Sequence, residues 1–444
     1  MALRAGAHLP IGPLHAGVAE VEYKPALGLM LGDAAPVALG YRTPLFIKAL
    51  VFSNGHDEVA VLAADLINFD RRDVAKVVAK AHERCGIRPD AVLISCSHSH
   101  VSPATNRRSL LYQQAFNASF SQEKWEKQLA FIDGMVDTMA DAICEAKANL
   151  QPASVGVVTA DLPWLTFNRR RYTRNYHAWT HWMKIPPNQA YGVEGPIDPE
   201  FGLLVVRDAQ HRPLAMLWNF SGHNSFYFDD QYSADISYTV QAMLDERLGA
   251  HIPTLYTPGC GGNTNYFDYG QPGGLEKATE GVASAIAAIY REACTLPEVK
   301  LAGSKVSLFF PPRDNTRYWW KNDVQNKLPS WINYGERGML AAQEAARERG
   351  AYQTEVTVLC LGEVALVGLP GEIFVEFGLM LKERSPFRRT FVTSYTNDGA
   401  GYIPTRRAFL GGSYEAWHTS SPTGREAGYK MVDKAVELLT EFAG

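Results

Sequence analysis

The sequence lacks the features that would direct a protein to a membrane or to nucleic acid. No apolar run reaches the roughly 18 residues of a membrane-spanning helix. The formal net charge is -4, so there is no basic excess to bind a phosphate backbone. The start, MALRAGAHLPIGPLHAG, has no continuous apolar segment, and we expect no signal peptide there.

Cysteine is scarce, and no two cysteines form a Cys-x-x-Cys pair. The six cysteines stand at positions 85, 96, 144, 260, 294 and 360. In a chain of 444 residues this scatter is typical of buried thiols rather than of a disulfide framework. Together with the missing signal peptide, it predicts a cytoplasmic protein. The partner that we expect is a small-molecule substrate, and the sequence leaves the oligomeric state open.

Strand-like runs followed by a helical segment and a further strand recur three times along the chain. The rounds comprise 45–53, 58–67, 70–84 and 91–96; then 201–208, 214–220, 235–248 and 253–257; then 354–361, 363–369, 373–383 and 389–396. Helical segments at 275–294 and 424–442 are apolar enough to pack on sheets. This order predicts an α/β fold of mixed β-sheets flanked by helices, with polar loops gathered where strands end.

No segment has the composition of a linker between domains, so we interpret residues 1–444 as a single domain. Residues 1–14 would then be an N-terminal extension. The region 305–350 is the hardest to interpret, and its aromatic and helix-like stretches suggest an insertion near the site.

Histidines follow two of the predicted strands. In VLISCSHSHVSPAT, an apolar run from Val92 leads to His98 and His100, which would share one face if the strand continues through them. A His-x-His pair is a common way to present imidazoles to a metal, although a hydrogen-bonded pair at a strand end is the alternative. His223 in WNFSGHNSF follows another strand. Glu372 in LPGEIFVEFG suits the first turn of a helix, which would explain it without a metal.

Together these motifs resemble the catalytic domain of the neutral, non-lysosomal ceramidases, from about residue 15 onward. The matching stretches are AGVAEVEYKP, AADLINF, SHSHVSP, FNRR, SGHNS, LPGEIFVEFG and GYIPTRRAFLGGSYE. The resemblance implies the ceramidase-like catalytic fold. It also implies a Zn²⁺ ion held by four ligands, namely His98, His223, Glu372 and Tyr402.

The same resemblance places His100, Arg169 and Tyr414 at the substrate as catalytic groups. Two imidazoles, a carboxylate and a phenol suit Zn²⁺, which can lower the pKa of water from 15.7 to roughly 7. His100 would then transfer a proton, Tyr414 would stabilise an oxyanion, and Arg169 would anchor the substrate.

The sequence departs from the ceramidase pattern in its glycine-rich loop, GCGGNTNYF. Asn263 stands where ceramidases have Asp, and Asn265 stands where they have the reactive Ser. Asparagine can donate and accept hydrogen bonds but is no nucleophile, so we expect ceramide itself to be a poor substrate. We place both residues, with Asn168, among the groups that bind the substrate. Compared with the ceramidases, we expect this protein to lack their immunoglobulin-like C-terminal domain.

The stretch FNRRRYTRNYHAWTHW (167–182) has four Arg, two His and two Trp. It is either a solvated loop or a site wall for a small, polar, anionic substrate. We therefore expect a zinc-dependent hydrolase that cleaves an amide or related bond. A metal-dependent lyase or isomerase acting on an acidic sugar fits nearly as well. A binding protein that keeps the metal without catalysis is a third hypothesis.

Overall fold

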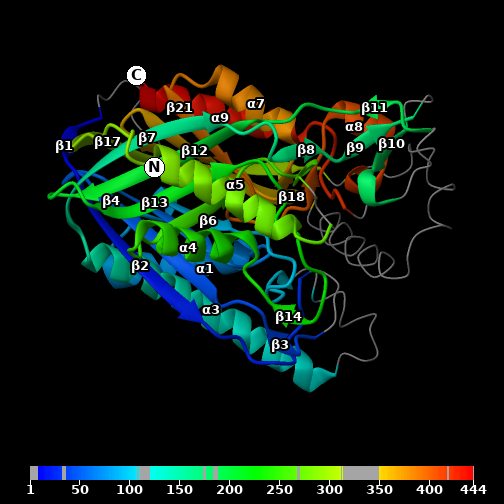
Figure 1. Ribbon diagram of the computed structural model, residues 1–444, viewed down its shortest axis with the longest axis horizontal. Helices are drawn as coiled ribbons and strands as arrows, with labels where there is room; N and C mark the ends of the chain where they lie inside the picture. The colour runs from blue at the N-terminus through cyan, green and yellow to red at the C-terminus, as the bar shows by residue number, and fades with distance from the viewer. Residues whose placement is uncertain are drawn as a thin grey trace.

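The computed structural model describes residues 9–32, 37–107, 110, 121–173, 177–183, 189–267, 271–311, 313, 350–417 and 420–443. Two β-sheets form the centre of the molecule (Figure 1). The larger sheet has, in spatial order, β15 (Thr254–Pro258), β13 (Pro213–Phe220), β12 (Glu200–Asp208), β7 (Gln151–Asp161), β2 (His15–Tyr23), β4 (Leu45–Ser53), β5 (Glu58–Ala64) and β6 (Val92–Cys96). The smaller sheet has β1 (Ile11–Pro13), β17 (Glu298–Phe310), β18 (Tyr352–Leu361), β19 (Val364–Gly368) and β21 (Arg389–Thr393).

The alternation of side chains along the strands separates two hydrophobic layers. In β4, Leu50 and Phe52 belong to a core that also contains Leu359 and Leu366 of the smaller sheet. Ile47 and its neighbours of the same parity face the opposite way, against helices. The two sheets therefore pack face to face, and helices cover the outer face of each.

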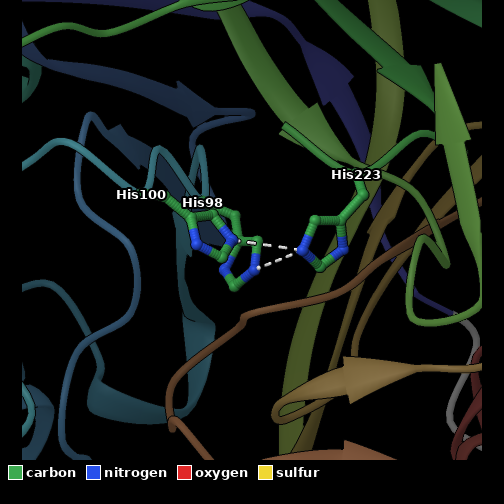
Figure 2. Close-up of side chains that lie close together, drawn as sticks. All are labelled: His98, His100 and His223. Carbon is green, nitrogen blue, oxygen red and sulfur yellow. Dashed lines mark hydrogen bonds between the residues drawn. The ribbon is translucent and has the colours of Figure 1, made fainter. Parts of the chain in front are cut away.

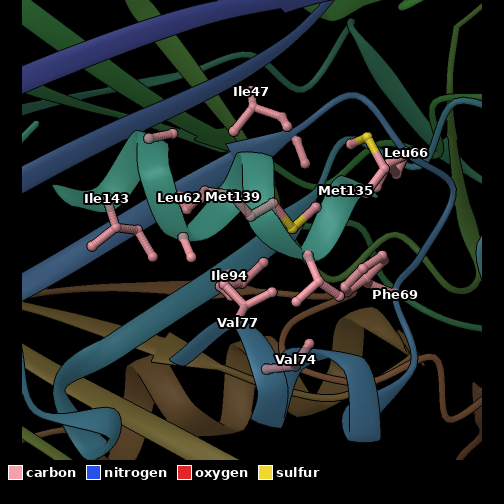
Figure 3. Close-up of a cluster of buried hydrophobic side chains, with 14 of the residues drawn as sticks. Ile47, Leu62, Leu66, Phe69, Val74, Val77, Ile94, Met135, Met139 and Ile143 are labelled. Atoms are coloured by element: carbon pink, nitrogen blue, oxygen red, sulfur yellow. The ribbon is translucent and has the colours of Figure 1, made fainter. Parts of the chain in front are cut away.

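The helices divide between the two outer faces. Those over the larger sheet are α1 (Arg71–Cys85), α3 (Gln122–Ala148), α4 (Ile236–Leu248) and α5 (Gly274–Ile289). Those over the smaller sheet are α7 (Val375–Arg384) and α9 (Ala427–Ala443). Figure 3 shows α1 and α3 covering the larger sheet, where Val77, Met139 and Ile143 pack over Leu62. None of the described helices is long and apolar enough to cross a membrane.

The mixed α/β architecture predicted from the sequence is confirmed, and the strands and helices of all three rounds are present. The 27-residue helix α3 has no counterpart among the segments predicted above. Residues 305–310 continue strand β17, while residue 312 and residues 314–349 of the expected insertion lie outside the described residues. Part of the expected N-terminal extension, β1, pairs with β17.

The two edges of the larger sheet approach each other at one end of the molecule. The segment that follows β21 connects them: the Ser394 amide donates to the Pro258 carbonyl of β15 (2.9 Å), and the Cys96 amide of β6 donates to the Tyr395 carbonyl (3.3 Å). The Ile94 amide of β6 also donates to the Asn397 side chain (2.9 Å). The loops after β6, β13, β15, β19 and β21 therefore come together at this end.

Candidate metal centre

Three imidazoles meet where these loops come together (Figure 2). The Nε2 atom of His223 lies 3.2 Å from Nε2 of His98 and 3.2 Å from Nε2 of His100. The prediction that His98 and His100 share one face of a strand is wrong, because β6 ends at Cys96. His98 has a left-handed backbone (φ 62°), which turns the chain out of the strand and brings both rings to the same point.

Hydrogen bonds to backbone carbonyls establish the tautomers of two of these rings. Nδ1 of His98 lies 2.8 Å from the Ile67 carbonyl, and Nδ1 of His223 lies 3.2 Å from the Gly261 carbonyl. A carbonyl can only accept, so each Nδ1 carries a proton, and in the neutral ring each Nε2 then has a lone pair. Two buried lone pairs at 3.2 Å disfavour each other unless a cation lies between them, which fits a metal site.

Burial favours the neutral form of two of the imidazoles, His223 and His100, and a neutral ring can bind a cation. It lowers the pKa of His223 well below the usual range, and Arg169 and the neighbouring histidines add to the effect. Burial also lowers the pKa of His100, with further contributions from His98 and Arg169. Neutral imidazole is the form that binds metals.

The carboxylate of Glu372 completes the set of convergent donors. Its Oε2 atom lies 3.5 Å from Nε2 of His98 and 3.9 Å from Nε2 of His223. This oxygen is buried and has no hydrogen-bond partner among the residues that the structure describes. An unpartnered buried carboxylate oxygen is costly, and a metal ion would remove that cost. Nitrogen and carboxylate donors of this kind suit Zn²⁺.

The predicted phenol ligand, Tyr402, lies beside Glu372. The short strands β20 (Glu372–Ile373) and β22 (Tyr402–Ile403) are parallel, with Glu372 opposite Tyr402. The Tyr402 hydroxyl accepts a hydrogen bond from Nη2 of Arg169 (2.9 Å). Burial raises the pKa of Tyr402 well above its usual range, and the Arg169 charge opposes that rise.

Arg169 is surrounded by protein acceptors rather than by an open cavity. Its Nε donates to Glu415 (2.9 Å), its Nη1 to Asn265 (3.1 Å), and its Nη2 to the Gly262 carbonyl (2.9 Å) as well as to Tyr402. Its side chain is 4% exposed. This geometry is typical of a residue that positions its neighbours, and the role of Arg169 as a substrate anchor stays a prediction.

The next residue, Arg170, is also buried and paired. It binds Glu415 through Nη1 (2.7 Å) and Glu194 through Nε and Nη2. Glu415 also accepts a hydrogen bond from Thr180 (2.8 Å), and its pKa is lowered mainly by Arg170 and Arg169, against the effect of burial. The first two arginines of the 167–182 stretch are therefore neutralised by two glutamates. Glu415 lies within the motif GGSYE, but nothing in that motif indicates its partners.

The three predicted substrate-binding asparagines have different surroundings. Asn168 is bonded at both ends of its amide, to the Pro196 carbonyl (2.9 Å) and to the Arg170 amide (3.0 Å). Asn263 contacts the start of α7. Asn265 lies against the site: its side chain accepts from Arg169, and its backbone forms an isolated bridge with His223.

Aromatic side chains surround the predicted catalytic residues. The Tyr414 ring meets those of Tyr402, Trp182 and Trp417 edge to face, with centroids 5.3–5.4 Å apart. Phe228 is 64% exposed, and its ring centroid lies 5.5 Å from that of His100. Flat or apolar groups of a ligand would be favoured beside these rings.

Comparisons with proteins of known structure agree with this architecture. One structure, a neutral ceramidase from Pseudomonas aeruginosa, superposes with a TM-score of 0.71 at 16% identity, covering 97% of this chain and 74% of that one. Another, described as a ceramidase complexed with C2, has a TM-score of 0.70 at 14% identity, covering 97% of this chain and 75% of that one. No family model and no curated protein sequence matches the chain. The protein therefore has the neutral-ceramidase fold.

Proposed function

We propose that this protein is a zinc-dependent hydrolase that cleaves an amide or related bond. The observation that carries the proposal is that the Nε2 atoms of His98, His100 and His223 lie within contact distance of one another, beside a buried Glu372 oxygen that has no hydrogen-bond partner among the described residues. The likeness to ceramidase structures supports a hydrolase, and the donor set supports a metal.

In this proposal His98, His223, Glu372 and Tyr402 hold the ion. When bound, Zn²⁺ supplies Lewis-acid activation of water and of a carbonyl group. His100, whose Nε2 is 3.2 Å from His223, carries a proton between the water and the leaving group.

The remaining groups act on the substrate or on each other. Tyr414 and Asn265 donate hydrogen bonds to the oxygen that becomes negative. Arg169 keeps Tyr402 and Asn265 in place.

The proposed substrate is small and polar rather than ceramide, because Asn265 occupies the place of the ceramidase serine. The support for an anionic group is weaker than the sequence suggested, since Arg169 and Arg170 are paired with glutamates. The same pairing removes the main reason to favour a lyase acting on an acidic sugar. We propose a substrate with a polar amide and a flat or apolar group that contacts the aromatic side chains.

Metal content tests the proposal directly. Purified wild-type protein is expected to contain about one zinc per chain, and His98→Ala or His223→Ala is expected to lose it. His56→Ala, at an exposed histidine in the turn between β4 and β5, is the matched control and should keep zinc. Zinc retained by His100→Ala, with kcat lowered typically by 10²–10⁴-fold, would agree with a proton-transfer role. Loss of zinc in that variant would make His100 a ligand.

The reaction class is tested with water labelled with ¹⁸O. A screen of N-acyl amino acids, N-acyl sugars, uronate glycosides and ceramide identifies a substrate, and one labelled oxygen per turnover is expected in the product. An unsaturated product without label would identify a lyase. A wild type free of metal after expression with zinc would overturn the proposal, and turnover unchanged by metal removal would end the role of zinc in catalysis.

A further inference from the structure

We infer that Tyr395, which has no role in the function proposed above, positions two of the metal-binding histidines. The inference rests on the proposed metal site. Tyr395 is 1% exposed and lies within the segment that connects the two edges of the larger sheet. It contacts all three segments that carry the proposed ligands His98, His223 and Glu372.

The Tyr395 side chain touches two histidines in different ways. Its ring stacks on the His98 ring, with centroids 3.8 Å apart and planes inclined by 12°. Its hydroxyl lies 3.3 Å from Nδ1 of His223, the nitrogen that also faces the Gly261 carbonyl. The Tyr395 side chain therefore sets the plane of the His98 ring and gives the His223 ring a second hydrogen-bond partner.

The Tyr395 backbone connects the third ligand to the same residue. Its amide donates to the Gly371 carbonyl (2.9 Å), next to Glu372, and its carbonyl accepts from Cys96 (3.3 Å), two residues before His98. Tyr395 has a left-handed backbone (φ 53°), an uncommon conformation for a bulky residue. Strain of this kind persists where the surrounding structure enforces it, and it clusters at functional sites.

These contacts restrain the directions in which the Nε2 lone pairs of His98 and His223 point. The bond from Nδ1 of His98 to Ile67 restrains one point of that ring, and the stacked Tyr395 ring restrains its plane. Hydrogen bonds to the second nitrogen of a metal-binding histidine orient it and raise its basicity, and their loss typically weakens metal binding by about 10–100-fold. The Tyr395 hydroxyl would act in this way on His223.

A Tyr395 that only filled space would behave differently. Tyr395 also packs in the hydrophobic core formed by β4, β5, α1 and α3. If this packing were its only role, Tyr395→Phe, which keeps the ring and removes only the hydroxyl, would bind zinc as the wild type does. The comparison of Tyr395→Phe with Tyr395→Leu therefore separates the hydroxyl from the stacked ring.

The test measures zinc affinity by chelator competition in wild type, Tyr395→Phe and Tyr395→Leu. We expect Tyr395→Phe to weaken zinc binding by about 10-fold or more and Tyr395→Leu to weaken it further. Tyr290→Phe is the control, because it removes the hydroxyl of a buried tyrosine that accepts a hydrogen bond from Arg291 (2.8 Å) and not from a metal-binding histidine. The visible spectrum of the Co²⁺-substituted protein should change in Tyr395→Phe and stay unchanged in Tyr290→Phe.

Equal zinc affinity and equal Co²⁺ spectra in wild type and Tyr395→Phe would overturn the inference for the hydroxyl, and equal affinity in Tyr395→Leu would overturn it for the ring. A wild type that binds no zinc would overturn the proposed function instead. In that case the ¹⁵N chemical shifts of His223 in the metal-free protein test whether the Tyr395 hydroxyl positions His223. A change in Tyr395→Phe would support positioning, and unchanged shifts would contradict it.

Discussion

Single residues around the site have unusual backbone conformations that no local pattern requires. His98, Tyr395, Asn397, Asp235 and Ser413 all have positive φ without being glycine. Such conformations cost free energy and persist only when tertiary contacts hold them. Because these residues lie in the loops around the histidines, we infer that the fold loses some stability there in order to place the side chains of the site.

Asp235 offers a test of this exchange through pH. Burial raises the pKa of this carboxyl from 3.8 to about 7, and within the described part of the chain its Oδ1 atom has no hydrogen-bond partner. The folded state therefore binds the proton more tightly than the unfolded state, so stability falls as pH rises from about 4 to about 7 and stays lower above. Asp235→Asn avoids the buried charge, and asparagine tolerates positive φ.

We therefore expect Asp235→Asn to gain stability over wild type as pH rises through this window, by up to about 4 kcal/mol. Urea unfolding between pH 4.5 and 8 measures the difference. Asp161→Asn, at an exposed carboxylate, is the control and should show no such trend. A difference that does not change with pH would contradict the buried, protonated carboxyl.

Among the elements, helix α7 begins with help from a distant loop. Its N-cap residue, Phe374, has no side chain that can cap the helix. Asn263, from the loop after β15, accepts from the Val375 amide (2.8 Å) and donates to the Glu376 carboxylate (2.9 Å). The asparagine that departs from the ceramidase pattern is thus a capping residue supplied from another part of the chain.

Asn263→Ala is expected to destabilise the protein by roughly 1–2 kcal/mol, through the lost cap and the lost partner of a buried carboxylate. Asn263→Asp keeps the acceptor for Val375 but places a carboxylate against Glu376. Burial already raises the pKa of Glu376, and the Asn263 hydrogen bond counters that rise. The aspartate variant should therefore lose more stability as pH increases. Free energies of unfolding in urea that are the same for both variants and the wild type would contradict the capping role of Asn263.

Over the whole molecule, the candidate metal centre connects the two sheets. His98 and His223 follow strands of the larger sheet, and Glu372 follows β19 of the smaller one. A ligand that binds the folded state alone stabilises it by about 2.7 kcal/mol at a concentration 100 times its Kd. Zinc is therefore expected to hold the sheets together at this end.

Removal of zinc by a chelator is expected to lower the Tm by a few degrees, and zinc added back should restore it. Differential scanning calorimetry on wild type, His98→Ala and His56→Ala makes the comparison. The chelator effect should be absent in His98→Ala and intact in His56→Ala. A wild-type Tm that does not respond to zinc would contradict a metal that joins the sheets.

The order of strands and helices could be predicted because short-range hydrophobic patterns specify them. The placement of polar residues at strand ends followed from the same patterns. The family motifs predicted His98, His223, Glu372 and Tyr402 as one set of ligands, and the structure places Glu372 near both histidines and opposite Tyr402. The exact end of β6 was missed, because Cys96 is followed by a left-handed turn that no local signal requires.

The partners of the site residues could not be predicted. Arg169 pairs with Glu415, 246 positions away, and Tyr395 touches His223, 172 positions away. These contacts exist because the edges of an eight-stranded sheet come together through the segment after β21. Alternation and helical periodicity describe neighbours a few residues apart, whereas the approach of β6 and β15 depends on how the two sheets and their helices pack as one body.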